Sequence, residues 1–528
     1  MTSSRIGHVA IVAVVAAVMA SVPTGASAAP KSPVVATDRG PVRGVAVGQM
    51  QEFLGIPYAA APIGDLRWRP PQEHAGWPGV LDASDFGAHC PQLATPYGTP
   101  STTEDCLFLN VFTPDKTNQG RPHLLPVMFW IHGGGLVVGQ SDGYDPSKLV
   151  AQDVVVVTIN YRLGELGFLA HPALAAESPT GATGNYGLMD QQAAMRWVQR
   201  NIRAFGGNPD NVTIFGESAG GLSVHSQLSS PLAAGLFHKA IVESGAYSLT
   251  QPTLAAAEAA GTAFATSAGC SSQTAACLRG LSVSAILAAQ PGGTMVPNLD
   301  GFLLPQTVRS AFTSGQFNRV PVIEGSNHDE WRLFVAQTEA TTHVPLTAAG
   351  YIPALQATFG FSLSVATFVA TSPLGYPLAN YSSPSVALGA VGTDLVFSCN
   401  ARISSRLLSQ FVPTYQYEFN DPNAPMLYFP PPISFLTGAY HASELTYIFD
   451  LSGTPVPSPG FTPAQEDLSD AMVGYWTRFA RSGDPNSAGE PAWPPYGTTD
   501  QFQSLHPSTP TTGTGFATDH KCAFWGLN

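Results

Sequence analysis

The sequence predicts an α/β fold in which helices cover both faces of a mostly parallel, twisted central sheet. Residues 154–159 form an unbroken β-branched run, as expected of a strand that is buried on both faces of a parallel sheet. Strand-like and helix-like segments then alternate along the chain, which is the pattern of a doubly wound sheet. Ligands of such sheets bind beyond the carboxyl ends of the strands.

Length and charge limit the classes of protein to consider. The chain has 528 residues and a formal net charge of −13 at pH 7. Large α/β enzymes reach this length as one unit, and the sequence shows no repeat, linker or low-complexity block, so we expect one domain over residues 29–528. The acidic balance argues against nucleic acid as a partner, because phosphate binding needs a basic face. The oligomeric state stays open.

The first residues have the form of an export signal. Residues 9–19 are continuously apolar, and Ala26–Ala28 is a small-x-small cleavage site. A membrane anchor would need roughly 20 apolar residues, and this run is shorter. No later stretch reads as a membrane span. We therefore expect residues 1–28 to be a signal peptide and the mature protein to be secreted, extracellular and without stable membrane insertion.

Six cysteines fit an exported chain, because an even number in a secreted protein indicates disulfides. Six cysteines allow fifteen pairings, and the sequence alone does not choose among them. The simplest prediction joins sequence neighbours: Cys90 with Cys106, Cys270 with Cys277, and Cys399 with Cys522. No His/Cys grouping has the spacing of a metal site, so we expect neither a metal nor a cofactor.

Ser218 lies in the segment Gly216-Glu217-Ser218-Ala219-Gly220, between an apolar strand at 211–215 and a helix start. A glycine two places on either side of a serine at such a turn is the signature of a nucleophile elbow. Small neighbours leave room for a strained turn that exposes the serine hydroxyl. The alternative is an ordinary glycine-rich turn with a surface serine.

A second glycine-rich turn, His132-Gly133-Gly134-Gly135, follows the apolar strand predicted over residues 126–131. Three glycines after a core strand leave backbone N–H groups free to converge on a ligand, as in the oxyanion hole of an esterase. The alternative is a flexible turn.

The other elements are placed by periodicity and by glycine and proline breaks. We expect helices at 187–204 and 465–481 and within 250–300 and 340–400. We expect further strands within 33–55, after Glu104, and at 239–245, 320–324 and 414–419. The loop 421–437 is rich in proline and aromatic residues, and either lines a substrate gorge or packs in the core.

Taken together, the motifs resemble those of the type-B carboxylesterases, a branch of the α/β-hydrolases that includes the cholinesterases, and a secreted bacterial member in particular. They follow the family order across nearly the whole mature chain. The motifs are Glu104–Asn110, His132–Gly135, Asn160–Leu169, Gly184–Asp190, Gly206–Asp210, Gly216–Gly221, Gly325–Glu330 and Gly438–Glu444. The resemblance implies an α/β-hydrolase fold and a secreted serine carboxylesterase that cleaves small-molecule esters through an acyl-enzyme on Ser218.

The resemblance also implies a catalytic triad in the chain order of α/β-hydrolases, serine, acid and histidine. It gives Ser218 as the nucleophile, Glu330 rather than Asp329 as the acid, and His441 as the base. His132 and His328 are the nearest rivals of His441.

The resemblance further implies an oxyanion hole formed by the N–H groups of Gly134, Gly135 and Ala219, and disulfides that match the neighbour pairing. Next to the triad, we expect Glu217 to be buried support and consider a hydrogen bond from Ser244.

Buried ion pairs of Arg67 with Glu104 and of Arg162 with Asp190 are implied as well.

Two features of the sequence depart from the family pattern. Residues 91–105 contain no tryptophan, so choline esters are not the expected substrates, since cation–π binding of their ammonium group would be missing. Trp331 replaces a small residue after Glu330 and is expected to change the packing there.

Three alternative functions use the same fold. A lipase would use the loop 421–437 as an interfacial lid, and a feruloyl or polyester-type esterase would differ only in its pocket. A non-catalytic adhesion module would be expected to lack the serine or the histidine, but Ser218, Glu330 and His441 are all present.

Overall fold

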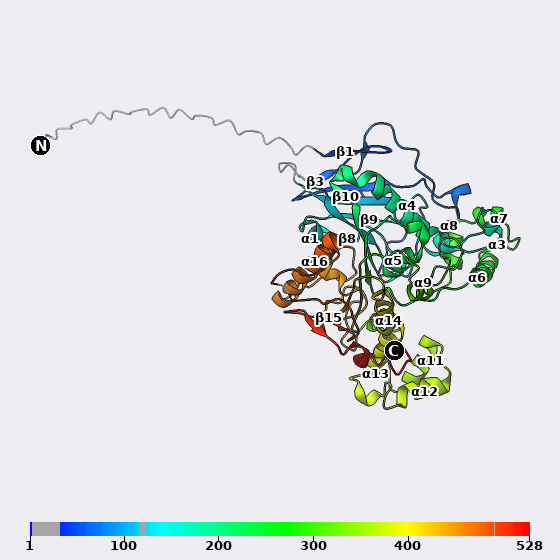
Figure 1. The fold of residues 1–528 in the computed structure, drawn as a ribbon, viewed down its shortest axis with the longest axis vertical. Coiled ribbons are helices and arrows are strands. Elements are labelled where there is room, and N and C mark those ends of the chain that lie inside the picture. The colour runs from blue at the N-terminus through cyan, green and yellow to red at the C-terminus, as the bar shows by residue number, and fades with distance from the viewer. Residues whose placement is uncertain (3–31, 116–122, 490, 528) are drawn as a thin grey trace.

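The structure is a computed structural model that describes residues 1–2, 32–115, 123–489 and 491–527. The predicted signal peptide therefore lies, except for its first two residues, outside the described residues. The described chain forms an eleven-stranded sheet (Figure 1). In spatial order its strands are β16 (Thr511–Gly513), β15 (Phe502–Leu505), β13 (Thr414–Phe419), β12 (Val322–Asn327), β11 (Lys239–Glu243), β10 (Gly207–Glu217), β7 (Leu125–Ile131), β9 (Val155–Ile159), β6 (Phe108–Pro114), β4 (Met50–Pro57) and β3 (Val45–Val47).

The strands from β15 to β9 are parallel to one another, whereas β16 at one edge and β6, β4 and β3 at the other each pair antiparallel with the strand on their inner side. The predicted α/β fold with a mostly parallel sheet is thus confirmed. Two small sheets accompany it, one of β1 (Val34–Thr37), β2 (Gly40–Arg43) and β5 (Leu81–Asp82), the other of β8 (Tyr144–Asp145) and β14 (Asp450–Leu451).

Helices follow most of the strands, and two of the expected helices have nearly the predicted bounds. The helix expected at 187–204 is α4 with a 3-10 turn after it, and the helix expected at 465–481 is α16. The α-helices are α1 (Ser147–Val150), α2 (Gly164–Phe168), α3 (Pro172–Ala175), α4 (Tyr186–Asn201), α5 (Ala219–Ser229), α6 (Leu254–Ser267), α7 (Ala275–Gly280), α8 (Val283–Ala289), α9 (Val308–Ser314), α10 (Arg332–Thr342), α11 (Tyr351–Phe359), α12 (Leu363–Thr371), α13 (Pro384–Gly392), α14 (Cys399–Leu408), α15 (Leu445–Ile448), α16 (Pro463–Ser482) and α17 (Phe516–Asp519).

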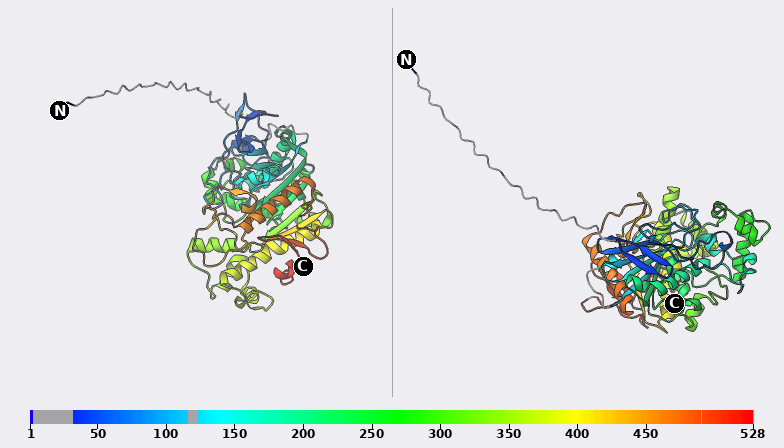
Figure 2. Two further views of the ribbon diagram at one scale, coloured as in Figure 1. Left: turned by 90° about the vertical axis from the view of Figure 1, so that its left-hand side faces the viewer. Right: turned by 90° about the horizontal axis from the view of Figure 1, so that it is seen from above.

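Each face of the sheet has its own hydrophobic core. Along β7, Phe129 packs on the face covered by α4 and α5, whereas the next residue, Trp130, packs on the face covered by α16. This alternation is the two-residue period of a strand. Figure 1 shows α4, α5 and α14 on one side of the central strands and α16 on the other, and the left view of Figure 2 shows α16 (orange) crossing its face. The site described below lies at the carboxyl ends of the central parallel strands.

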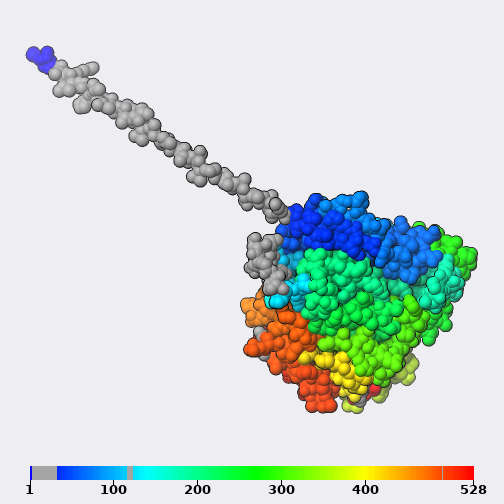
Figure 3. Space-filling view, turned by 45° about the horizontal axis from the view of Figure 1, so that its top comes forward, coloured from blue at the N-terminus to red at the C-terminus, as the bar shows by residue number. Residues whose placement is uncertain are grey.

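Three disulfides join the six cysteines as sequence neighbours. The Cα–Cα distances are 4.9 Å for Cys90–Cys106, 5.7 Å for Cys270–Cys277 and 5.4 Å for Cys399–Cys522. The last bridge fixes the carboxyl-terminal segment to the start of α14. In the space-filling view of Figure 3, the first described residues of the body (blue) and the later segments (orange and red) lie at opposite ends of the molecule.

One helical stretch, Pro384–Leu408, is long and apolar enough to cross a membrane by length and composition, which corrects the expectation that no later stretch would be. The protein interior buries 78% of its most apolar window. The apolar character of this stretch is therefore explained by packing in the core. Its middle part, Thr393–Ser398, is a π-helical turn between α13 and α14.

His520 anchors the carboxyl-terminal segment through two buried ion pairs. Its Nδ1 lies 2.7 Å from Asp394 Oδ1, and its Nε2 lies 2.5 Å from Glu418 Oε1. Burial alone would lower the pKa of His520, but the hydrogen bonds to Asp394 and Glu418 outweigh it and raise the pKa to about 10. The imidazolium is therefore part of the folded state at neutral pH.

This anchor predicts a loss of stability in alkali. A histidine whose pKa rises on folding from 6.5 to about 10 gives stability that is complete below pH 6.5 and is lost as the pH rises to 10. We expect His520→Asn to lower the free energy of unfolding by about 3–5 kcal/mol at pH 6, because two buried carboxylates lose their partner. Urea unfolding should be measured at a series of pH values. The difference in the free energy of unfolding between wild type and variant should become smaller above pH 6.5. Parallel stability curves would contradict this.

Candidate active site

Ser218 lies at the turn between β10 and α5. Its backbone has φ 55° and ψ −117°, a strained conformation for any residue with a side chain. The turn is held by a hydrogen bond from the Ser218 N–H to the Glu243 carbonyl at 2.8 Å. A Cβ added to Gly220 would collide with the carbonyl of Ile131, so only glycine permits this close approach of α5 to β7. The strand, strained serine and helix form the predicted nucleophile elbow.

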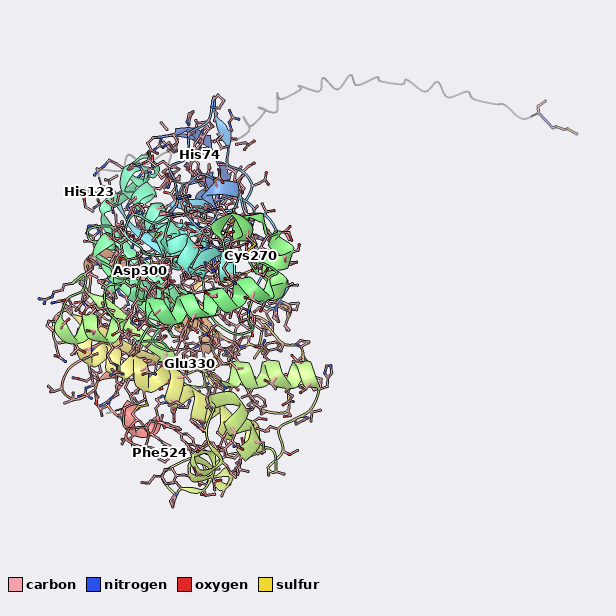
Figure 4. The ribbon with its side chains drawn as sticks, turned by 90° about the vertical axis from the view of Figure 1, so that its right-hand side faces the viewer. His74, His123, Cys270, Asp300, Glu330 and Phe524 are labelled. Atoms are coloured by element: carbon pink, nitrogen blue, oxygen red, sulfur yellow. A yellow bond between two sulfur atoms is a disulfide. The ribbon has the colours of Figure 1, made fainter. Side chains whose placement is uncertain are left out.

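Glu330 follows the end of β12 and is fully buried. Its Oε1 accepts a hydrogen bond from the Asn327 N–H at 2.8 Å, and its Oε2 lies 2.6 Å from Nδ1 of His441. The N–H of His441 also donates to the Glu330 carbonyl at 3.2 Å. Side chain and backbone therefore fix the imidazole on the carboxylate. Glu330 lies near the middle of the molecule in Figure 4.

The other nitrogen of His441, Nε2, is directed toward the elbow. It lies 3.1 Å from Oε1 of Glu217, the residue before Ser218. Among the described residues, the Ser218 hydroxyl has no hydrogen-bond partner and is partly exposed, while Glu217 is buried. The structure thus brings the three predicted triad residues to one place. In it, Nε2 faces the neighbouring carboxyl group instead of the hydroxyl.

Glu217 belongs to a group of buried carboxyl groups behind the elbow. Burial, together with the charges of Glu330 and Glu243, raises the pKa of Glu217 well above its usual range. Burial also raises the pKa of Glu243 to about 7, against a hydrogen bond from Trp476 Nε1 at 3.0 Å that acts to lower it. A neutral Glu217 leaves Glu330 as the carboxylate that orients His441. The expectation that Glu217 is buried next to the triad agrees with this position.

The glycine turn after β7 lies against the elbow. A Cβ added to Gly133 would lie 3.2 Å from the Cβ of Ser218, so the two turns are in contact. Gly134 and Gly135 have φ values of 97° and 64°, and no described group accepts a hydrogen bond from their N–H groups. Ala219 is the first residue of α5, whose N–H has no partner within the helix. The backbone hydrogen bonds of the described residues therefore leave these three N–H groups without a partner.

The rival histidines have other partners. His132 is fully buried and stacks on Tyr161 with a ring separation of 4.4 Å. Burial lowers the pKa of His132 to about 4, so its imidazole is neutral. His328 pairs with Asp329 at 3.1 Å, and Asp329 in turn pairs with Arg332 at 2.8 Å. Neither histidine contacts Glu330.

One group of residues in the described part of the chain has the composition of a metal site. Ligand atoms of His328, Glu418 and Asp519 lie within 4.8 Å of one another. Glu418 is already paired with His520 at 2.5 Å, and His328 with Asp519 at 3.3 Å. The two carboxylates of this group therefore already pair with the imidazole groups of His520 and His328.

Two aromatic rings pack against the imidazole of His441. The ring of Phe397 lies 4.8 Å from it and that of Phe334 lies 5.4 Å from it, and the two phenyl rings are nearly parallel, with 9° between their planes. Phe397 belongs to the π-helical turn Thr393–Ser398, and such turns are frequent at functional sites. Nothing in the sequence pattern indicates this contact, because a π turn has no sequence periodicity of its own.

The π turn also explains how Trp331 is accommodated. The Trp331 N–H donates to Oγ1 of Thr393 at 3.0 Å, and its ring lies so close to Gly392 that any side chain there would collide with it. The ring also contacts Phe334 at 4.7 Å. The expected change of packing behind Glu330 is thus an aromatic cluster against a glycine.

The contact between Phe397 and His441 predicts a role in positioning the base. We expect Phe397→Leu to lower kcat about fivefold, since an aromatic contact of this kind contributes about 1 kcal/mol, which here would be lost from the positioning of the imidazole. Phe312→Leu is a matched control, because Phe312 packs on a different buried histidine, His225, at 5.4 Å. Both variants should lose thermal stability, but only Phe397→Leu should lose rate per folded molecule. Equal rates for the two variants would contradict the assignment.

Two further expectations concern residues around the site. The N–H of Ser244 donates to the Gly325 carbonyl at 2.9 Å, but the buried Ser244 hydroxyl has no hydrogen-bond partner among the described residues. In the loop 421–437, Ala424, Tyr428 and Phe429 are buried in the core on the α16 face. These three residues of the loop therefore pack as core.

The two implied ion pairs are present; Arg162 and Asp190 are both buried, whereas Arg67 is buried and Glu104 is half-buried. Arg67 binds Glu104 through two hydrogen bonds of 2.7 and 2.5 Å, and Arg162 binds Asp190 through two of 2.7 Å. Arg162 also donates to the carbonyl of Arg69 at 2.9 Å. Removing one partner would leave a buried charge at a cost of about 3–5 kcal/mol.

Comparisons with known proteins agree with this geometry. Residues 31–525 match the Carboxylesterase family. Human cocaine esterase is 36% identical over 509 residues, which cover 92% of this chain and 88% of that protein. Fumonisin B1 esterase of Sphingopyxis macrogoltabida is 35% identical over 490 residues, covering 87% and 83%. A solved structure of PNB esterase has a TM-score of 0.75 and 33% identity, covering 94% of this chain and 99% of that one.

Proposed function

Because this chain belongs to the carboxylesterase family and is a serine carboxylic ester hydrolase, we propose that Ser218, His441 and Glu330 carry out its reaction. The observation that carries the proposal is the hydrogen bond of 2.6 Å between Glu330 Oε2 and His441 Nδ1, beside a strained serine at the elbow. This bond fixes the tautomer in which Nε2 is free to accept a proton.

In the first half of the reaction the Ser218 hydroxyl attacks the ester carbonyl. A bond forms between Oγ and the carbonyl carbon while Nε2 of His441 takes the hydroxyl proton. This step needs Nε2 to turn from Glu217 toward the hydroxyl, a short movement because the two residues are adjacent in the chain. Glu330 then stabilises the imidazolium.

The N–H groups of Gly134, Gly135 and Ala219 receive the oxyanion that forms. Each donor contributes about 3 kcal/mol to lowering the barrier. His441 gives its proton to the departing alcohol, and the carbon–oxygen bond to that alcohol breaks. In the second half, water gives a proton to His441, attacks the acyl-enzyme and releases the acid, so that Ser218 regains its proton.

We also propose that the enzyme acts outside the cell as one domain over residues 29–528. Three disulfides support an oxidising compartment, and the first 28 residues have the pattern of a signal peptide. The sheet that runs from β3 to β16 supports a single unit, since both ends of the chain contribute strands to it.

The test uses p-nitrophenyl esters from acetate to laurate. We expect a burst of one p-nitrophenol per chain, followed by steady turnover, and an acyl group on the peptide that contains Ser218 by mass spectrometry. Turnover with no acyl group on that peptide would place the nucleophile elsewhere. A rise in rate only above the solubility limit of the ester would instead support the lipase alternative.

A further inference from the structure

The helical lobe after α10 carries no charged side chain over a long stretch. Residues 340–393 contain no Asp, Glu, Lys or Arg, although charged residues make up 11% of the chain. The stretch includes α11, α12 and α13, and Figure 1 shows α11 and α12 at the end of the molecule opposite β1. The stretch itself therefore offers no carboxylate, ammonium or guanidinium group for an ion pair with a partner.

An apolar patch lies on the outside of this lobe, and we define it as Leu363, Val365, Phe368, Leu374 and Phe524. The exposed fractions of Leu363, Phe368 and Leu374 are 63%, 60% and 76%. The ring of Phe368 stacks on that of Phe524 at 5.5 Å, and Figure 4 shows Phe524 at this end of the molecule. A Cβ on Gly375, next to Leu374, would lie 3.2 Å from the Phe524 ring. Phe368 and the turn of Leu374 and Gly375 both adjoin Phe524, and adjoining exposed apolar residues mark interaction surfaces on soluble proteins.

The charge of the molecule selects among possible occupants of the apolar patch. With a net charge of −13, the protein is repelled by an anionic surface. Helices that bind anionic membranes carry lysine and arginine on their polar face, and α11 and α12 have none. The exposed polar residues of α12 include Ser364 and Thr371, whose hydroxyl groups cost far less to desolvate than a charge. This pattern is complementary to a neutral apolar phase.

The patch is also continuous with the active site. A series of ring contacts, with centroid separations from 4.8 to 6.2 Å, joins the imidazole of the base to the patch. In order, the rings are those of His441, Phe397, Trp331, Phe359, Phe361, Trp525, Phe524 and Phe368. The lobe therefore packs directly on the groups that hold the base in place.

From these observations we propose that the apolar patch docks the enzyme on an uncharged lipid surface, and that esters dissolved in that phase are substrates of the Ser218 site. The inference rests on the proposed function and names the physical state of its substrate. Docking on the patch requires no covalent step and leaves the chemistry at Ser218 unchanged.

The test measures binding and turnover separately. Wild-type enzyme should sediment with vesicles of neutral phosphatidylcholine, and adding phosphatidylglycerol to the vesicles should weaken the binding. The double variant Phe368→Ser/Leu374→Ser should bind neutral vesicles at least tenfold more weakly, because two large exposed apolar side chains are lost. It should hydrolyse dissolved p-nitrophenyl acetate at the wild-type rate and an emulsified neutral ester at least tenfold more slowly.

A matched control changes two apolar residues at the opposite end. Val34 and Val47 have exposed fractions of 52% and 49%, and Val34→Ser/Val47→Ser should bind vesicles like wild type. The proposal fails if wild type does not bind neutral vesicles or if the patch variant binds as well as wild type. It also fails if the patch variant converts a dimer to a monomer in lipid-free sedimentation, since the patch would then contact a second copy. Failure on the dissolved ester would instead count against the proposed function.

Discussion

Ser218→Ala should abolish nearly all ester hydrolysis while leaving the fold intact. Removing the nucleophile of an acyl-transfer enzyme of this type lowers kcat by about a million-fold, and the remaining rate comes from the oxyanion donors and from substrate binding. Alanine keeps the Cβ that the backbone already carries at φ 55°, so the elbow between β10 and α5 should not change. KM should stay close to that of wild type.

The measurement is kcat on a dissolved p-nitrophenyl ester, together with thermal unfolding. Ser226→Ala is a suitable control, because Ser226 lies on the same helix and its hydroxyl bonds to the Leu222 carbonyl at 2.9 Å. The control should keep nearly full activity. If Ser218→Ala kept about a hundredth of the activity or more, the serine would not be the nucleophile.

Glu330→Gln should produce the second largest loss, about ten-thousand-fold in kcat. Glutamine has nearly the same shape, but its amide can donate to Nδ1 of His441, which lies 2.6 Å from Oε2 in the wild type. A donated hydrogen bond favours the tautomer with the proton on Nε2. That nitrogen then cannot accept the proton of Ser218.

Asp329→Asn provides the matched control for Glu330→Gln. Asp329 is the adjacent carboxylate, and it pairs with Arg332 and accepts a hydrogen bond from the Ala439 N–H at 3.1 Å. Its loss should lower the free energy of unfolding by about 1–3 kcal/mol and leave most of the activity. The opposite result, a large loss of kcat for Asp329→Asn and a small one for Glu330→Gln, would exchange the two roles.

The aromatic contacts around His441 connect these effects with the apolar patch. Phe397 reaches the imidazole because the π turn breaks the regular helical register between α13 and α14. Trp331 and Phe334 pack on the Phe397 ring from the side of α10. A change in the lobe that shifted these rings would alter the position of the base. For this reason the test of the patch uses exposed residues and a dissolved substrate as reference.

The strands of the sheet and the motifs that follow them could be predicted because each depends on local sequence. Every residue of the run 154–159 is β-branched, and all except Thr158 are apolar. A strand that is buried on both faces requires such a run. The elbow could be predicted because the strained φ of Ser218 needs small neighbours within two residues. The pairing of cysteines was the simplest of several possibilities, and the distances along the fold were needed to choose it.

Other features depend on contacts between distant segments. The approach of Glu217 to Nε2 of His441 joins residues far apart in the chain, and the expectation that Glu217 is buried next to the triad did not specify this partner. The contact of Phe397 with the same imidazole requires a π turn, which no periodicity indicates. The helical stretch 384–408 has the length and hydropathy of a membrane span, and only the folded structure shows that it is packed in the protein interior.

Local sequence was enough to indicate the class of chemistry, since the nucleophile elbow and the glycine turn are short-range patterns with steric causes, and the resemblance to the type-B carboxylesterases then implied the acid and the histidine. The sequence also determined that residues 340–393 carry no charge. Only the tertiary structure decided which carboxylate holds His441, which rings orient it, and that Phe368 and Leu374 remain exposed. The physical reason is that burial and side-chain partners depend on segments brought together by folding, whereas turn strain and charge content are properties of neighbouring residues.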